Sequence, residues 1–463
     1  MKKLHQFLTF PTLLVGLVSC DFTIIDSANG TESSQSIEST TDITSYESLE
    51  SLETKTEENS LASVNSSEDF SEEFSSTSEQ VLVEPRDMLY GVCYIFSERY
   101  RFEENMDKDI QLLTNLGVGS VRLWGNFSIY LKNSTTINAE ECQKMHSFVS
   151  KLQANGITPI YMNYVSFDHG KDIKSNKYTR DITKNSNYIN WLTEYYMSWK
   201  TIAKEFSEIT YFEVGNEINN GDFMKDINGT AMTSMQEMAS ISADMLYHAS
   251  RGIKTSNKEA KVVLGGLTET RRLGSGENVD FLNKLYACIK SGEYGYMYKV
   301  ENQSTASKDP DDYFDIACWH PYVHGEKITK EQFVQRNNAM YDVILTNEPE
   351  GKDVFFTEVG FTDNNQTYDE NRQSLIMFYD ALKEMPYVKA VTYFKLFDNA
   401  VISWVGTYSR WGFIFDPNPN NKYNNIVNEE EEIPVNGSAK PIAYAFQEIA
   451  GGSGNLDLLE VKE

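Results

Sequence analysis

Eight short apolar segments recur after residue 86, and stretches with helical character lie between them. Each segment is rich in Val, Ile, Tyr or Phe. Near-continuous apolar strands that alternate with helices are typical of parallel β-α-β units, and eight such units predict an α/β fold, the (β/α)8 or TIM barrel. An open, doubly wound sheet is the structural alternative. The expected strands are residues 88–94, 120–124, 158–163, 210–216, 261–265, 314–320, 353–358 and 389–396.

The stretches between the strands are of two kinds. Some show the apolar spacing of an amphipathic helix, as in residues 105–116, 371–385 and 441–450. Others are long inserts, which follow the third, fifth and eighth strands at residues 165–187, 268–312 and 398–440. Barrel enzymes build their binding clefts at the carboxyl ends of the strands, so these inserts predict a cleft at that end.

The first 19 residues are interpreted as a signal peptide. Lys2 and Lys3 precede an apolar stretch at residues 7–18, which is shorter than the ~20 residues that a membrane span needs. A buried strand or helix is the alternative interpretation. Residues 17–20, Leu-Val-Ser-Cys, resemble the lipobox of bacterial lipoproteins. That resemblance implies cleavage before Cys20, attachment of lipid (including palmitate) to Cys20, and a membrane anchor at the extracellular face of the bacterial cell membrane.

Residues 20–85 are expected to form the lipidated cysteine and a disordered tether. Between residues 27 and 84, 23 of 58 residues are Ser or Thr, and this segment carries −13 of the net charge of −27. Its isolated apolar residues cannot offset the entropy lost on ordering. The folded domain is expected at residues 86–454, with a tail at 455–463. The acidic balance argues against a nucleic-acid partner, because phosphate binding needs clustered Lys and Arg, and no protein partner is implied.

Two glutamates stand at the ends of expected strands. Glu217 follows Asn216 at the end of the fourth strand, and Glu358 ends the seventh. A carboxylate at the end of an apolar strand is costly unless it is paired or functional. A structural ion pair explains either glutamate alone. The two together, at strands four and seven of eight, are a more specific signal.

These residues resemble those of the retaining glycoside hydrolases of clan A, and the resemblance covers roughly residues 86–454. Within the clan, residues 315–322 and 440–444 look most like the β-xylosidase-like and endoglucanase-like families. The resemblance implies that Glu217 is the acid/base and Glu358 the nucleophile. It also places Asn216 on the substrate 2-hydroxyl, and Arg122 matches the arginine that ends strand two in the clan.

The chemistry of glycoside cleavage suits these roles. One carboxyl group must be protonated to donate to the leaving oxygen, and the other must be ionised to attack the anomeric carbon. Retaining enzymes hold the two groups ~5–5.5 Å apart. A guanidinium from Arg122 near Glu358 would favour its ionised form, and ionised Glu358 would in turn keep Glu217 protonated.

The cleft itself is expected to be lined by residues that follow other strands. His320 and Tyr322 follow strand six. The resemblance implies that both line the cleft and that the tyrosine can hydrogen-bond the nucleophile; a histidine satisfied within the core is the alternative for His320. Trp124 and Trp404 offer indole faces on which the C–H faces of sugars stack. Strand eight lacks the tryptophan that commonly floors the cleavage subsite in the clan, and Trp404 is the candidate replacement. No further His or Cys joins His320 in the sequence, so neither a metal nor a cofactor is expected.

The sequence therefore predicts a surface-tethered retaining β-glycoside hydrolase. It would cleave O-glycosidic bonds of an extracellular oligo- or polysaccharide by double displacement, with carbohydrate as its only predicted partner besides the membrane. The alternative is a non-catalytic carbohydrate-binding lipoprotein. A binding protein has no reason to place glutamates at the ends of strands four and seven, so Glu217 and Glu358 separate the two hypotheses.

Overall fold

The computed structural model describes residues 88–99, 101–164, 188–225, 230–268, 277–293, 307–323, 328–362, 366–399, 410–421 and 435–458. The expected signal peptide, Cys20, the tether and Trp404 all lie outside these residues. Residues 455–458 of the expected tail are described. Leu456 is buried in the core, and the Asn455 carbonyl accepts a hydrogen bond from the Asn115 side chain at 2.7 Å.

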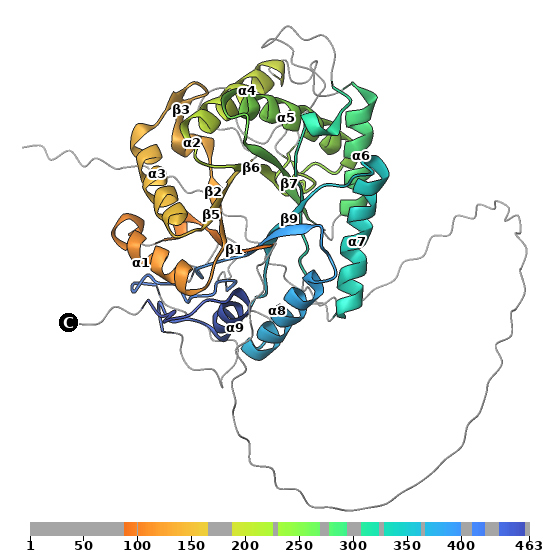
Figure 1. Ribbon diagram of the computed structural model, residues 1–463. Coiled ribbons are helices and arrows are strands. Elements are labelled where there is room, and N and C mark those ends of the chain that lie inside the picture. The colour runs from red at the N-terminus through yellow and green to blue at the C-terminus, as the bar shows by residue number, and fades with distance from the viewer. Residues whose placement is uncertain are drawn as a thin grey trace, which may run out of the picture. The chain divides into compact units, whose positions relative to one another are not determined.

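Eight parallel strands close into a barrel in the order β1-β10-β9-β8-β7-β6-β5-β2 (Figure 1). This order is the sequential order of a TIM barrel, in which each strand pairs with its neighbours along the chain and the last strand pairs with the first. The strands are β1 Leu89–Tyr94, β2 Ser120–Gly125, β5 Thr158–Asn163, β6 Tyr211–Asn216, β7 Lys261–Thr268, β8 Ala317–His320, β9 Val354–Val359 and β10 Val388–Tyr393.

All eight expected strands are present, and most of their bounds agree within one or two residues. Three bounds differ by three residues: the fifth strand, β7, ends at Thr268 instead of 265, the sixth, β8, begins at Ala317 instead of 314, and the eighth, β10, ends at Tyr393 instead of 396. Beyond Tyr393 the pairing is mixed. The Phe394 and Leu396 amides still donate to the carbonyls of Val359 and Cys93 in the neighbouring strands, whereas the Lys395 amide donates to the Trp411 carbonyl and its carbonyl accepts from the Phe413 amide.

Helices surround the barrel (Figure 1), and their apolar faces pack on the outside of the strands. A continuous core results because the strands are apolar on both faces. The helices are α1 Phe102–Asn115, α2 Phe127–Tyr130, α3 Ala139–Ala154, α4 Tyr188–Glu205, α5 Met235–Ser256, α6 Glu277–Ser291, α7 Lys330–Asn347, α8 Tyr368–Leu382 and α9 Pro441–Ala450.

One expected insert is wrong in part. Residues 268–312 were expected as a single long insert, but they contain α6, which covers the barrel between α5 and α7. Phe281, Leu285 and Ile289 of α6 have helical spacing and are fully buried. A short antiparallel pair, β3 Leu131–Asn133 and β4 Thr136–Ile137, also follows β2 and was not expected.

Candidate active site

The carboxyl ends of β6 and β9 bring the two glutamates together. Glu217 directly follows β6, and Glu358 lies at the end of β9. An oxygen of Glu217, an oxygen of Glu358 and a nitrogen of His320 all lie within 4.8 Å of one another. Both glutamates are at least nine-tenths buried, at 2% and 5% exposure. The two carboxyl groups can therefore reach the same small reacting centre.

Arg122, in the middle of β2, binds the carboxylate of Glu358. Its Nη1 donates to Glu358 Oε1 at 2.5 Å, while Nε and Nη2 form a bidentate pair with Glu213 at 2.7 Å each. Nη2 also donates to Asn216 Oδ1 at 2.8 Å. Burial alone would lower the pKa of Arg122, but the Glu213 and Glu358 carboxylates outweigh burial and raise that pKa well above its usual value. The guanidinium is therefore a permanent positive charge beneath the site.

The side-chain oxygen of Asn216 already accepts a hydrogen bond, whereas its side-chain nitrogen can still donate one to a substrate. Its Oδ1 accepts from Arg122, which fixes the orientation of the amide. Its nitrogen donates no hydrogen bond to the residues that the structure describes. A donor of this kind, next to Glu217, is suited to a substrate hydroxyl.

His320 and Tyr322 approach the carboxylates from β8 and the residues after it. The Tyr322 hydroxyl donates to Glu358 Oε2 at 2.8 Å. His320 Nδ1 lies 3.4 Å from Glu217 Oε1 and 3.7 Å from Glu358 Oε2, so the imidazole lies beside both glutamates. Its ring has room because β7 carries Gly266, where a Cβ atom would lie 2.0 Å from His320 Nε2.

The backbone at Glu217 is held in an unusual conformation. Its φ of 47° falls in the left-handed region, which costs a non-glycine residue of order 1–3 kcal/mol. The turn that follows supports it, since the Asn220 amide donates to the Glu217 carbonyl at 2.8 Å, and Asn220 Nδ2 donates to Glu217 Oε2 at 3.0 Å. Surroundings that impose such a backbone also fix the direction of the side chain.

Trp124 lies at the end of β2 and is half-buried. Its ring packs edge-on against Tyr164 at 5.3 Å and is tilted against Phe394 at 5.7 Å, measured between ring centroids. Phe394, directly after β10, also contacts Trp411 at 6.3 Å, and Trp411 contacts Tyr322 at 5.6 Å. Aromatic rings thus connect the end of β2 to the nucleophile's partner Tyr322.

Two further residues of this network were not found from the sequence. Glu213, inside β6, is fully buried and pairs with Arg122. The Thr357 hydroxyl, next to Glu358, lies 3.0 Å from each of Glu213 Oε1, His320 Nε2 and Cys318 Sγ. An acidic residue inside an otherwise apolar strand is a signal that could have identified Glu213. Thr357 carries no such signal, because threonine is common in strands.

The sequence offered no further His or Cys beside His320 as a metal ligand, and the fold corrects this expectation. Glu213, Cys318 and His320 offer atoms within 4.8 Å of one another, so other possible ligands do join His320 in the fold. The Thr357 hydroxyl occupies the space between them, in contact with all three side chains. All four described cysteines, namely Cys93, Cys142, Cys288 and Cys318, are free and buried.

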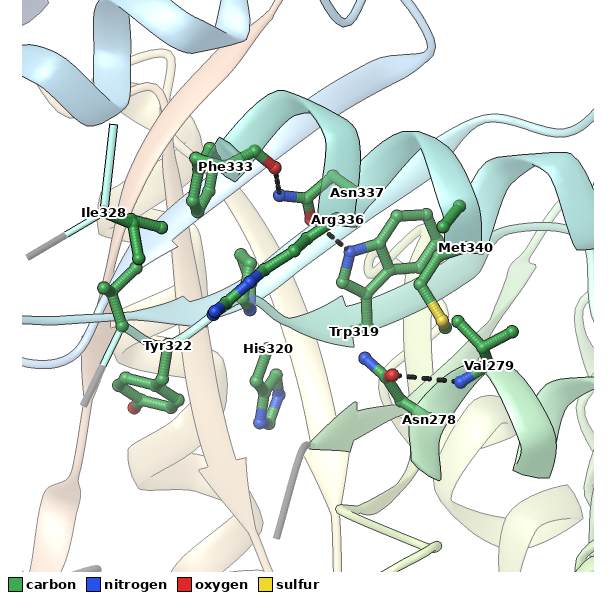
Figure 2. A pocket seen from close by; sticks show the side chains of 13 residues that line it. Asn278, Val279, Trp319, His320, Tyr322, Ile328, Phe333, Arg336, Asn337 and Met340 are labelled. Atoms are coloured by element: carbon green, nitrogen blue, oxygen red, sulfur yellow. Dashed lines mark hydrogen bonds between the residues drawn. The ribbon is translucent and has the colours of Figure 1, made fainter. Parts of the chain in front are cut away.

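A pocket of about 260 Å³ adjoins this cluster between the end of β8 and helices α6 and α7 (Figure 2). His320 and Tyr322 line one side of it, and Arg336 of α7 extends toward them. Trp319 forms part of the wall, where its Nε1 donates to Asn337 Oδ1 at 2.7 Å. The pocket adjoins the site through His320 and Tyr322, whose side chains also contact the two glutamates.

Residues 88–398 match the family Cellulase (glycosyl hydrolase family 5). This match covers more than half of the chain and nearly the whole barrel. The chain belongs to glycosyl hydrolase family 5. It is therefore a retaining glycosidase, and membership agrees with the clan that its sequence resembles. No curated protein is a significant match.

Solved structures of other glycosidases share the fold. A family 39 glycoside hydrolase from the gut symbiont Bacteroides cellulosilyticus WH2 superposes with a TM-score of 0.52 at 13% identity, over 78% of this chain and 63% of that protein. A family 1 β-glucosidase from Thermotoga maritima gives 0.51 at 14% identity, over 81% of this chain and 99% of that protein. Among the described residues, no helix combines the length and apolarity needed to cross a membrane.

Proposed function

We propose that the chain cleaves β-glycosidic bonds of an extracellular oligo- or polysaccharide, with Glu217 as acid/base and Glu358 as nucleophile. The observation that carries this proposal is the distance between the two carboxyl groups, whose nearest oxygens lie within 4.8 Å. Retaining enzymes hold these groups ~5–5.5 Å apart, whereas inverting enzymes leave room for a water at ~6.5–9.5 Å.

In the first step, a Glu358 oxygen attacks the anomeric carbon while the bond to the leaving oxygen breaks. The proton of Glu217 passes to that oxygen, so the leaving group departs as an alcohol. Arg122 and Tyr322 hold the two oxygens of Glu358 and direct the carboxylate. The Asn216 nitrogen donates to the substrate 2-hydroxyl, an interaction that strengthens in the transition state.

In the second step, Glu217 is ionised and removes a proton from water. The water oxygen bonds to the anomeric carbon as the bond to Glu358 breaks, which restores both glutamates. Two successive displacements leave the anomeric configuration unchanged. Trp124, at the end of β2, and Phe394, directly after β10, offer aromatic faces for the sugar ring.

Azide rescue of two alanine variants tests the two roles separately. Glu358→Ala is expected to lower kcat more than ~10³-fold, because it removes the covalent step. With a 2,4-dinitrophenyl β-glycoside, added azide should rescue Glu358→Ala to an α-glycosyl azide. The matched variant Glu217→Ala should give a β-glycosyl azide. Exchanged products would reverse the assignment of the two glutamates.

Assays with a panel of aryl β-glycosides and β-linked polysaccharides would identify the substrate. Release of sugar from the native protein, lost in Glu217→Gln, supports hydrolysis. Binding without release would support the carbohydrate-binding lipoprotein instead. We expect turnover on soluble substrates to be the same after removal of residues 21–85, since the tether is proposed only to hold the domain away from the membrane.

The membrane anchor rests on the lipobox-like residues 17–20. We propose that lipid on Cys20 holds the enzyme at the extracellular face of the cell membrane. Labelled palmitate should be incorporated into the native chain and not into Cys20→Ser, which should instead be found in the soluble fraction. Equal membrane association of the two proteins would refute the anchor.

A further inference from the structure

The Thr357 hydroxyl is a junction of hydrogen bonds beneath the two glutamates. Its oxygen lies 3.0 Å from Glu213 Oε1, from His320 Nε2 and from Cys318 Sγ. A hydroxyl has one proton to donate and two lone pairs with which to accept. Once the neighbour that accepts the hydroxyl proton is known, the other two neighbours must donate their hydrogen bonds to the hydroxyl oxygen.

Glu213 sets that direction. Both of its oxygens accept from Arg122 at 2.7 Å, and the Gly266 amide also donates to Oε1 at 3.3 Å. All these partners are donors, one of them a guanidinium, so Glu213 is ionised and carries no proton of its own. The Thr357 hydroxyl must then donate to Glu213, which is the strongest acceptor among its three neighbours.

The other two neighbours must donate to the Thr357 oxygen. Burial raises the pKa of the Cys318 thiol well above its usual value, so the thiol keeps its proton. His320 Nε2 likewise has to carry a hydrogen to make its 3.0 Å contact. In the neutral imidazole, a hydrogen on Nε2 leaves a lone pair on Nδ1.

That lone pair faces Glu217. Nδ1 lies 3.4 Å from Glu217 Oε1, while Asn220 donates to the other oxygen, Oε2, at 3.0 Å. A proton on Glu217 therefore belongs on Oε1, toward the imidazole. The opposite tautomer would direct an N–H group at Glu217 and at Glu358 Oε2, 3.7 Å away, and would favour the ionised form of Glu217.

We propose that Thr357 is a positioning residue that fixes His320 in its Nε2–H tautomer and so keeps Glu217 protonated in the resting enzyme. The inference rests on the proposed role of Glu217 as acid. Among the described residues, the ionisable groups around the imidazole are Glu217 and Glu213 from the β6 side, Glu358 from β9, Cys318 and Tyr322 from β8 and the residues after it, and Arg336 of α7 in the adjoining pocket. Arg122 of β2 lies beyond Glu213 and Glu358.

The tautomer can be measured without a substrate. Nitrogen-15 NMR of the histidine-labelled full chain, with the His320 signals assigned by their absence in His320→Gln, distinguishes the two ring nitrogens. Near neutral pH we expect hydrogen on Nε2 alone. Thr357→Ser should keep this state, and Thr357→Val, which removes only the hydroxyl, should lose it. Hydrogen on Nδ1 in the native protein would overturn the proposal even if Thr357→Val failed to fold.

Kinetics tests the consequence for the acid. In Thr357→Val, the alkaline limb of kcat/KM for a phenyl β-glycoside should move down by about one pH unit, and Thr357→Ser should restore it. The 2,4-dinitrophenyl glycoside needs no acid, so its rate should change little. Equal losses on both substrates would show a purely structural role and would refute the proposal.

Failure of the proposed function would look different. If Glu217→Gln hydrolysed the phenyl glycoside as fast as the native enzyme, Glu217 would not be the acid, whatever the tautomer of His320. If Glu217→Gln were inactive on the phenyl glycoside while Thr357→Val behaved as the native enzyme, only the inference about Thr357 would be wrong.

Discussion

Replacing Arg122 by methionine should destabilise the fold far more than removal of a surface arginine. Arg122 is fully buried and makes four hydrogen bonds, two to Glu213, one to Glu358 and one to Asn216. Methionine fills much of the volume but leaves Glu213 as a buried, unpaired carboxylate. Breaking a buried ion pair from one side costs about 3–5 kcal/mol, so we expect a loss of that size in the free energy of unfolding.

A second substitution should return part of this loss. Glu213→Gln removes the buried charge but keeps an oxygen that accepts from Thr357 and from the Gly266 amide. The double variant Arg122→Met/Glu213→Gln should therefore be more stable than the sum of the two single variants predicts. We expect a coupling free energy of at least about 1 kcal/mol.

Urea unfolding followed by tryptophan fluorescence measures these differences. Arg101→Met is the matched control, because Arg101 pairs with Glu104 at the surface, with the two side chains 58% and 67% exposed. An exposed pair contributes about 0–1 kcal/mol. If Arg122→Met lowered the free energy of unfolding no more than Arg101→Met, or if the cycle showed no coupling, the reasoning about the buried charges would be refuted.

Three other changes test separate features. Burial alone would lower the pKa of His146, but Glu205 and Glu208 outweigh burial and raise it. The ion pairs of His146 therefore stabilise the fold below about pH 6.5, and this contribution is lost as pH rises through the raised pKa. In urea titrations, His146→Gln should be less stable than the native chain at pH 5.5 and equal to it at pH 9. Gly266→Ala should displace His320 and lower kcat with little change in circular dichroism, and unchanged kcat would contradict the close approach. The four buried cysteines, Cys93, Cys142, Cys288 and Cys318, should react with thiol reagents at pH 8 only after the protein is unfolded.

The barrel could be predicted from the sequence because its strands are buried on both faces. That burial makes each strand a nearly continuous apolar run, which is visible without any knowledge of its neighbours. The end of β10 shows the limit of this reasoning. Phe394 and Leu396 still donate to Val359 of β9 and Cys93 of β1, but Lys395, buried between them, pairs with Trp411 and Phe413. Apolar character reports burial and does not identify the hydrogen-bonding partner.

The residues of the candidate site likewise fall into two groups, those that the sequence indicates and those that it does not. Glu217, Glu358 and Arg122 stand at recognisable places along strands, and a resemblance to a known clan gives them roles. Glu213 and Thr357 act through residues that are distant in the sequence, since Thr357 meets Glu213 across 144 residues. Such a contact depends on how β6 and β9 face each other across the barrel, which a pattern within one strand does not record.

The charges of the site together explain why one particular glutamate should hold the proton. Glu213 and Glu358 both bind the single guanidinium of Arg122, so this part of the site already carries a net charge of −1 when both are ionised. A third carboxylate charge with its nearest oxygen within 4.8 Å of a Glu358 oxygen would add a repulsion of at least about 3 kcal/mol at an effective dielectric constant of 20. Protonation of Glu217 removes this repulsion and leaves both ion pairs of Arg122, with Glu213 and with Glu358, intact.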